Sequence, residues 1–111
     1  MNAIIENMMT RRSVRAFKKD PVPTELIEQV IEAGTWAASG HDRQPWAIIA
    51  VTNPEVIAKL SKANASFFEH DVKDPFYGAP AIIIVLTKTF TPTYLYDGSL
   101  AMGNMMLAAH S

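Results

Sequence analysis

Hydrophobic residues recur at helical spacing twice in the first third of the chain. The first set, which predicts a short amphipathic helix, is Ile4, Ile5, Met8 and Met9. The second set follows the helix-breaking sequence DPVP and forms an apolar stripe at Leu26, Ile27, Val30 and Ile31. Thr24 is the expected N-cap of this second helix, and Glu25 is placed to favour its positive end. We expect the helix to loosen at Gly34, although the following TWAAS could continue it to about Ser39.

Two apolar runs are dense in β-branched residues and predict strands. WAIIAVT, residues 46–52, is expected to be a buried strand. AIIIVLT, residues 81–87, is hydrophobic on both faces and is therefore expected in the middle of a covered sheet. Between them, Asn53 is a helix cap followed by a proline at the first helical position and an acid in the first turn. SGHDRQP and residues from about 64 to 78 have the composition of irregular structure.

A last helix is predicted from about Tyr94, and its own residues SLAMGNMMLAAHS make it apolar nearly all round. Such a helix is expected to be buried. The elements that would bury it do not follow, because the sequence ends at Ser111. We therefore expect residues 1–111 to form a single domain that is truncated at its C-terminal end.

Composition places the chain among globular proteins and excludes several kinds of site. Hydrophobic residues make up 49% and charged residues 19%, and a net charge of −1 argues against general affinity for nucleic acid or acidic membranes. The absence of cysteine excludes disulfides and thiolate chemistry.

No signal peptide is evident and the longest apolar run is too short to span a bilayer, so a cytoplasmic location is expected. The spacing of His41, His70 and His110 is not that of a metal site, so no metal is expected.

The basic residues are concentrated near the N-terminus. Residues 11–19, RRSVRAFKK, contain five of the ten lysines and arginines. Arginine suits a phosphate group because its planar fork holds two oxygens at once and stays charged. In an extended segment, Arg11, Ser13 and Arg15 would share one face and could line a groove for an elongated anionic ligand. The alternative from charge alone is a solvated basic turn.

A second segment, AASGHDRQPW at residues 37–46, combines small residues, a polar loop and the start of a strand. Small residues allow a flat ring to approach the backbone closely. Gln44 can donate and accept hydrogen bonds at once, which the polar edge of a flavin ring requires. Taken alone, Gln44 could instead tether the loop, and Trp46 could belong to the core.

Four stretches, in this order, resemble the nitroreductase family of FMN-dependent oxidoreductases. They are RRSVRAFKKDPVP, EQVIEAGTWAASGHDRQPWAIIAV, FYGAPAIIIV and YDGSLAMGNMMLAAHS. The resemblance implies an α+β fold with a mixed, mainly antiparallel sheet flanked by helices, assembled as an intertwined homodimer. It also implies that family members continue beyond the last stretch with further strands and helices.

The resemblance assigns flavin contacts to both segments. The implied cofactor-binding set is Arg11, Arg12, Ser13, Arg15, Ala38, Ser39, Gly40 and Gln44. Within this set, Arg11 and Ser13 would hold the phosphate end of FMN, with Arg12 beside them. Arg15 would lie near the pyrimidine edge of the ring, where a fixed cation stabilises the negative charge of the reduced form. The small-residue loop would reach the FMN of the partner subunit.

Two further residues are candidates for the substrate pocket, and two positions depart from the family pattern. His41 lies in the expected flavin loop, and Phe68 could stack over the flavin, although core packing accounts for Phe68 equally well. Ala38 stands where the family usually has a proline, and Asp42 where it has an asparagine. An aspartate near an anionic reduced flavin is unfavourable unless Arg43 or another cation pairs with it.

The resemblance implies that NAD(P)H delivers hydride to bound FMN, which then reduces a nitroaromatic, quinone or similar flat acceptor. No catalytic acid or base is assigned, because the flavin carries the chemistry. One alternative is a flavin-binding but catalytically inactive protein. A second alternative is an interaction module that uses the basic segment to bind polyanions, although the chain lacks a recognised nucleic-acid motif.

Overall fold

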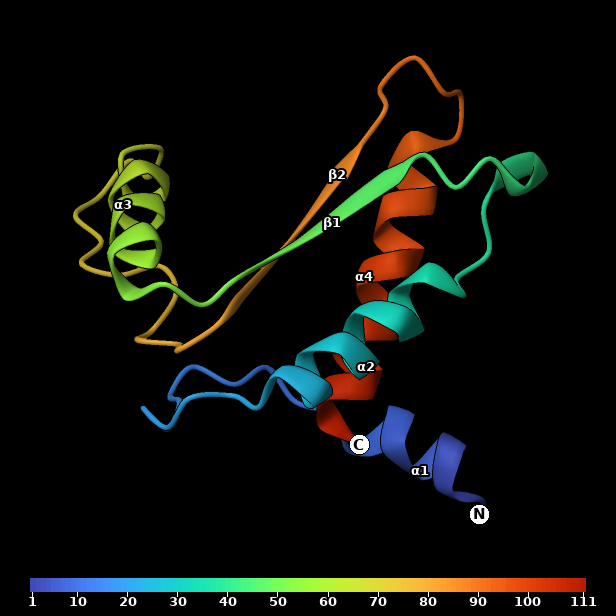
Figure 1. Cartoon of the computed structure of the whole chain (residues 1–111), viewed down its shortest axis with the longest axis horizontal. Coiled ribbons are helices and arrows are strands. Elements are labelled where there is room, and N and C mark those ends of the chain that lie inside the picture. The colour runs from blue at the N-terminus through green and yellow to red at the C-terminus, as the bar shows by residue number, and fades with distance from the viewer. The chain divides into compact units, whose positions relative to one another are not determined.

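The computed structural model describes all residues from 1 to 111. The chain alternates helices with two strands, as Figure 1 shows. In order, the elements are α1 (Ala3–Thr10), α2 (Thr24–Thr35), the 3₁₀ turn η1 (Gly40–Asp42), β1 (Trp46–Val51), α3 (Pro54–Ala65), β2 (Ile82–Thr87) and α4 (Tyr94–His110).

Contacts divide the chain into two compact units. The first unit consists of Met1–Arg12, Pro23–Ile49 and Val85–Ser111, and the second of Ser13–Val22 and Ala50–Ile84.

β1 and β2 are hydrogen-bonded neighbours in a two-stranded sheet and run in opposite directions (Figure 1). The Lys88 N–H donates to the Pro45 carbonyl at 2.9 Å, which extends the pairing just beyond the strands. The expectation that residues 81–87 lie in the middle of a covered sheet is wrong for this chain. A middle strand needs a paired neighbour on both sides, whereas β2 has only β1, and none of its residues is fully buried.

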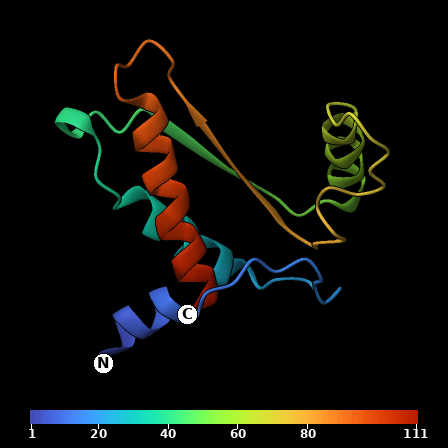
Figure 2. The same ribbon diagram turned by 180° about the vertical axis from the view of Figure 1, so that it is seen from behind.

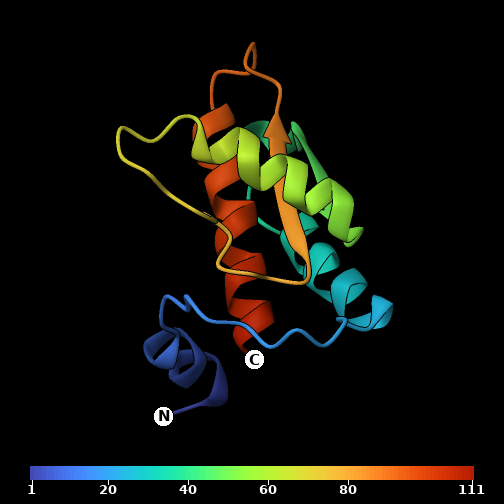
Figure 3. The same cartoon turned by 90° about the vertical axis from the view of Figure 1, so that its left-hand side faces the viewer.

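The core of the first unit lies where α2 packs against α4 (Figure 3). Gly34, near the end of α2, is buried against α4, and a Cβ there would lie only 2.7 Å from Met105 Cγ. The Asn104 side-chain amide donates to the Ala33 carbonyl at 3.0 Å and fixes the end of α2 on α4. A residue without a side chain therefore sets how closely the two helices approach.

α4 is buried along one stripe only, at Asp97, Ala101 and Met105, which are four residues apart. The expectation that this largely apolar helix is buried holds for this stripe only. Leu95 and Tyr96 remain exposed, because the chain supplies partners for only part of the helix surface.

α1 is attached to the C-terminal end of α4 (Figure 2). The Asn7 side-chain amide donates to the Leu107 carbonyl at 2.8 Å, and Thr10 Oγ1 lies 2.9 Å from His110 Nε2. The side chain of Asn2 caps the start of α1 by accepting from the Ile5 N–H at 3.0 Å. The short first helix is thus held at both of its ends.

The predicted N-cap of α2 needs a correction, whereas its end lies close to Gly34, where the helix was expected to loosen. Pro23, rather than Thr24, is the N-cap residue, because the Pro23 carbonyl already accepts the first helical bonds from Leu26 and Ile27. The helix does not continue to Ser39 but ends at Thr35. The Trp36 N–H donates to the Ala33 carbonyl at 3.4 Å, which forms a tighter final turn that closes the helix.

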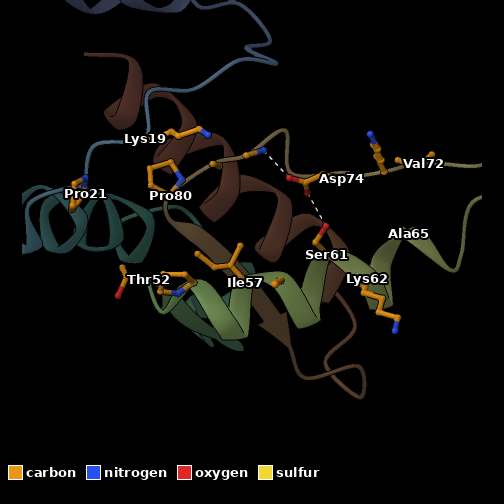
Figure 4. A pocket seen from close by; sticks show the side chains of 15 residues that line it. Lys19, Pro21, Thr52, Ile57, Ser61, Lys62, Ala65, Val72, Asp74 and Pro80 are labelled. Atoms are coloured by element: carbon orange, nitrogen blue, oxygen red, sulfur yellow. Dashed lines mark hydrogen bonds between the residues drawn. The ribbon is translucent and has the colours of Figure 1, made fainter.

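The second unit is built around α3, whose predicted start is confirmed. The Asn53 side chain accepts from the Glu55 N–H at 2.9 Å, and Pro54 takes the first helical position. The loop after α3 is organised by the carboxylate of Asp74 (Figure 4). This carboxylate accepts from the Ser61 hydroxyl at 2.7 Å, the Phe76 N–H at 2.9 Å and the Gly78 N–H at 2.8 Å.

These three hydrogen bonds, led by that from Ser61, hold the pKa of Asp74 below its ordinary value of 3.8. A hollow of about 720 Å³ adjoins the carboxylate (Figure 4), and its lining includes Lys19, Pro21, Ile57, Lys62 and Pro80. All of these residues belong to the second unit.

Candidate functional site

The loop from Ala38 to Gln44, which joins α2 to β1 in the first unit, has an unusual backbone. His41, Asp42 and Gln44 have φ angles of 52°, 53° and 50°, in the left-handed region that residues other than glycine rarely adopt. Each such residue costs roughly 1–3 kcal/mol and persists only where surrounding interactions enforce it. The loop is therefore held in a conformation that it would not adopt alone.

Internal hydrogen bonds supply part of that constraint. The Asp42 N–H donates to the Ser39 carbonyl at 3.1 Å, which forms the turn η1. The Ser39 hydroxyl oxygen accepts from the Gln44 N–H at 3.1 Å, and Gln44 Nε2 donates to Asp42 Oδ1 at 2.8 Å. Gln44 thus acts as a loop tether in this structure, and its amide nitrogen neighbours the Asp42 carboxylate.

The loop is also anchored to α4 by Asp97, a buried side chain with only 2% exposure. Asp97 Oδ1 accepts from the Gly40 N–H at 3.0 Å, and Oδ2 accepts from the Thr93 hydroxyl at 2.7 Å. Gly40 is required at this contact, because a Cβ there would lie 2.9 Å from Thr93 Cγ2 and closer still to Thr93 Oγ1. The loop backbone and the start of α4 are therefore in direct contact.

Asp97 was not among the residues singled out from the sequence. The available signal was the acid of YDGSLAMGNMM, the single charged residue in an otherwise apolar helix. A carboxylate in the first turn of a helix usually needs no special explanation, because it is stabilised by the helix dipole. Its contact with Gly40 joins residues 57 positions apart, which no local pattern reveals.

The arginines of the predicted phosphate site lie at the end of α1. Arg11 is the C-cap residue, with its N–H donating to the Asn7 carbonyl at 3.2 Å. Arg12 Nη1 donates to the carbonyls of Met9 and Arg11, both at 2.9 Å. A cation in this position satisfies carbonyls that the helix leaves without partners. Arg12 therefore caps the end of α1, a function that the basic run alone does not predict.

The structure brings some predicted site residues together and assigns others to the second unit. Ala38, Ser39, Gly40, His41 and Gln44 form one loop of the first unit, which also contains Arg11 and Arg12. Ser13, Arg15 and Phe68 belong to the second unit.

Within the second unit, the Phe68 ring meets the His70 ring edge-on, with the ring centroids 5.9 Å apart. Ser13 and Arg15 lie on an exposed segment that forms neither helix nor strand. The flavin contacts assigned to these two residues stay predictions, as does the substrate-pocket role of Phe68.

The structure has neither a cluster of metal-ligating side chains nor a membrane-spanning helix. No group of three or more histidine, aspartate or glutamate side chains is arranged to hold a metal ion. None of the helices combines the length and the apolar character needed to cross a membrane.

Comparison with known proteins identifies the family. The model of the nitroreductase family matches residues 8–111. The chain belongs to the nitroreductase family. A protein of Methanothermobacter thermautotrophicus provisionally named NADH dehydrogenase/NAD(P)H nitroreductase is 34% identical over 97% of this chain, which spans 56% of that relative. The resemblance seen in the sequence is thereby confirmed.

Solved structures support the same conclusion for the fold. A nitroreductase of Bacteroides fragilis with bound FMN matches 99% of this chain with a TM-score of 0.90 and 27% identity. A nitroreductase of Desulfitobacterium hafniense with bound FMN matches 99% with a TM-score of 0.88 and 29% identity. The chain covers 65% of each of these structures. The predicted α+β fold is confirmed, and the intertwined homodimer stays a prediction.

Proposed function

We propose that the chain forms part of an FMN-dependent oxidoreductase that uses NAD(P)H to reduce a nitroaromatic, a quinone or a similar flat acceptor. The observation that carries this proposal is the fold shared with two nitroreductases that contain FMN, over 99% of this chain. The name of the Methanothermobacter thermautotrophicus relative supports NAD(P)H as the electron donor. We further propose that the chain acts as a homodimer in which each loop at residues 38–44 serves the partner's flavin.

The residues of the chain fit FMN by their chemistry. The phosphate of FMN needs cationic and hydroxyl donors, which Arg11, Arg12 and Ser13 would supply. Both capping bonds of Arg12 use the single atom Nη1. A guanidinium has five N–H donors, so the remaining nitrogens of Arg12 can still serve a phosphate.

The loop at residues 38–44 fits the flat ring of the flavin. Ala38, Ser39 and Gly40 present small side chains, so a ring can approach the backbone closely. The hydrogen bonds from the Gln44 N–H to Ser39 Oγ and from the Gly40 N–H to Asp97 hold the loop in shape. Because little ordering is left for the moment of binding, the entropic cost of holding the ring is reduced.

FMN, when bound, supplies the hydride transfer from NAD(P)H to the acceptor. The chain's own residues would bind and tune it. Arg15 would place a fixed positive charge at the pyrimidine edge, where reduction leaves negative charge. Gln44 would lie beside the ring, and His41 and Phe68 would contact the acceptor. None of these side chains is assigned as a general acid or base.

The test is an FMN titration of the purified protein, followed by assays of NADH and NADPH oxidation with quinone and nitroaromatic acceptors. Arg11→Ala should weaken FMN binding about tenfold or more, since it removes a charge-assisted hydrogen bond to phosphate. Arg15→Ala should slow flavin reduction more than it weakens FMN binding. Lys18→Ala is the matched control, because Lys18 belongs to the same basic segment and has no assigned flavin contact.

The outcomes separate the alternatives. Equal FMN affinity in the wild type and Arg11→Ala would remove the phosphate assignment. FMN binding without turnover of any acceptor would support the flavin-binding but inactive alternative. A colourless protein that binds polyanions in a salt-sensitive manner would support the interaction module.

A further inference from the structure

Asp97 is the most deeply buried ionisable side chain in the structure, and the proposed chemistry does not use it. It is 2% exposed and shares its stripe of α4 with the apolar residues Ala101 and Met105. A buried carboxylate is costly unless its oxygens are hydrogen-bonded. Each oxygen has one neutral donor, the Gly40 N–H on Oδ1 and the Thr93 hydroxyl on Oδ2.

The hydrogen bond made by the Thr93 side chain orients the Asp97 carboxylate and does not cap α4. Thr93 is the N-cap residue of α4, a position where a threonine side chain normally accepts a hydrogen bond from the first turn. Its side chain makes no such capping bond and donates to Asp97 instead. The helix therefore forgoes a stabilising cap, while the carboxylate is oriented toward the loop.

The other end of the contact is the strained loop. Gly40 immediately precedes His41 and Asp42, and Gln44 follows, all three in the left-handed region. Without the bond to Asp97, the Gly40 N–H would lose its fixed direction, and these residues could relax to ordinary backbone conformations. The carboxylate is thus placed where it can hold the loop in the shape described above.

We propose that Asp97, oriented by Thr93, is a positioning residue that holds the Ser39–Gly40 backbone in the conformation that receives the flat ring of FMN. The inference rests on the proposed function for the identity of the ligand. The contact itself, between α4 and the loop, lies entirely within the first unit.

The second unit contains a matched control of the same chemistry. Asp74 also accepts from a hydroxyl, that of Ser61, and from backbone N–H groups, and it also organises a loop. No flavin contact is assigned to Asp74. A purely structural role for Asp97 would make Asp97→Ala behave like Asp74→Ala.

The experiment compares Asp97→Ala, Asp97→Asn, Thr93→Val and Asp74→Ala with the wild type. FMN affinity is measured by quenching of flavin fluorescence, and the environment of the bound ring by visible circular dichroism. Asp97→Ala should weaken FMN binding about tenfold and alter the dichroism. Asp97→Asn should restore most of the affinity, because its oxygen accepts from Gly40 and its amide nitrogen can donate to Thr93 Oγ1.

Thr93→Val keeps the shape of the side chain and removes only the hydroxyl, so it should cause a smaller loss of FMN affinity than Asp97→Ala. It also keeps the test decisive if Asp97→Ala does not fold. Asp74→Ala should lower the unfolding temperature and leave the FMN affinity within about twofold of the wild type. If Asp97→Ala, or in its place Thr93→Val, lowers the unfolding temperature without changing affinity or dichroism, the proposal is overturned.

A measurement without FMN separates this proposal from the proposed function. Amide hydrogen exchange at residues 40–44 of the flavin-free protein should accelerate in Asp97→Ala, more than in the rest of the first unit, and return toward wild type in Asp97→Asn. If the wild type binds no FMN, the proposed function fails, while this exchange pattern still tests whether Asp97 positions the loop. Unchanged exchange at residues 40–44 would overturn the positioning role whatever the ligand.

Discussion

The contact between Gly40 and Thr93 makes Gly40→Ala the most demanding test of the site geometry. A Cβ at residue 40 would lie 2.9 Å from Thr93 Cγ2 and 3.1 Å from Thr93 Cβ, with Thr93 Oγ1 nearer still. Thr93 cannot simply rotate away, because its hydroxyl donates to the buried Asp97 at 2.7 Å. The added methyl group must therefore either strain the contact or break that hydrogen bond.

The expected loss of stability follows from the cost of the strained contact or of the broken hydrogen bond. Overpacking by one methyl group costs about 1–3 kcal/mol, and loss of a hydrogen bond to a charged group costs about 1.5–3 kcal/mol. Gly40→Ala should therefore lower the free energy of unfolding by about 1–3 kcal/mol, whichever of the two occurs, a large share of the stability of a small domain. It should also weaken FMN binding, because the loop backbone must shift to admit the methyl group.

The assay is denaturant unfolding of a double-mutant cycle. Thr93→Ala removes both Oγ1 and Cγ2, so Gly40→Ala should be at least about 1 kcal/mol less destabilising in that background than in the wild type. Gly103→Ala is the matched control, because a Cβ at residue 103 of α4 meets nothing within 4 Å. This control should be neutral or stabilising by up to about 1 kcal/mol through helix propensity. The reasoning is refuted if Gly40→Ala is no more destabilising than Gly103→Ala.

Two further predictions concern the packing of α2 on α4 and the loop of the second unit. Gly34→Ala places a Cβ 2.7 Å from Met105 Cγ. Because methionine is flexible, the free energy of unfolding measured by chemical denaturation should fall by only about 1–3 kcal/mol. Met105→Ala should largely relieve this loss of stability. Because the pKa of Asp74 is lower in the folded protein than its ordinary value of 3.8, the ionised carboxylate stabilises the fold at pH values above 3.8. This contribution should disappear as the pH falls from 3.8 through the folded pKa. Urea midpoints measured against pH should show a shallower acid decline in Asp74→Asn; an unchanged decline would contradict the assignment.

Local sequence patterns predicted most of the elements correctly. Asn53 and Pro54 define the start of α3, and the β-branched runs define both strands, because each of these signals acts through neighbouring backbone. The start of α2 was misplaced by one residue, since Pro23 and Thr24 are both compatible with a helix start and only the carbonyl bonds of Pro23 decide between them. The place of β2 in the sheet and the extent to which α4 is buried could not be predicted from local patterns. Burial depends on partners, and apolar composition alone does not say whether the chain supplies them.

The candidate site shows the same division between local and long-range information. Arg11, Ser39, Gly40 and Gln44 could be singled out because residue type and order resemble a family pattern. The left-handed backbone at His41 and Gln44 could not be predicted in this way, since neither residue type requires it. It depends on a carboxylate that lies more than fifty residues away in the sequence, within a helix whose composition indicates only packing.

The conformation of the loop therefore depends on its attachment to α4. The loop residues Ala38, Ser39 and Gly40, which would approach the flat face of the flavin ring, are small and uncharged. Their usefulness lies in where the backbone runs and not in what their side chains donate. Such a backbone conformation needs a fixed anchor outside the loop. The hydrogen bond from the Gly40 N–H to the buried Asp97 carboxylate provides this anchor. Because Asp97 projects from the packed stripe of α4, the core of the first unit determines the position of the loop. Substitutions in that core, such as Met105→Ala, should then alter FMN affinity as well as stability, whereas substitutions on the exposed face of α4, such as Leu95→Ala, should leave the affinity unchanged.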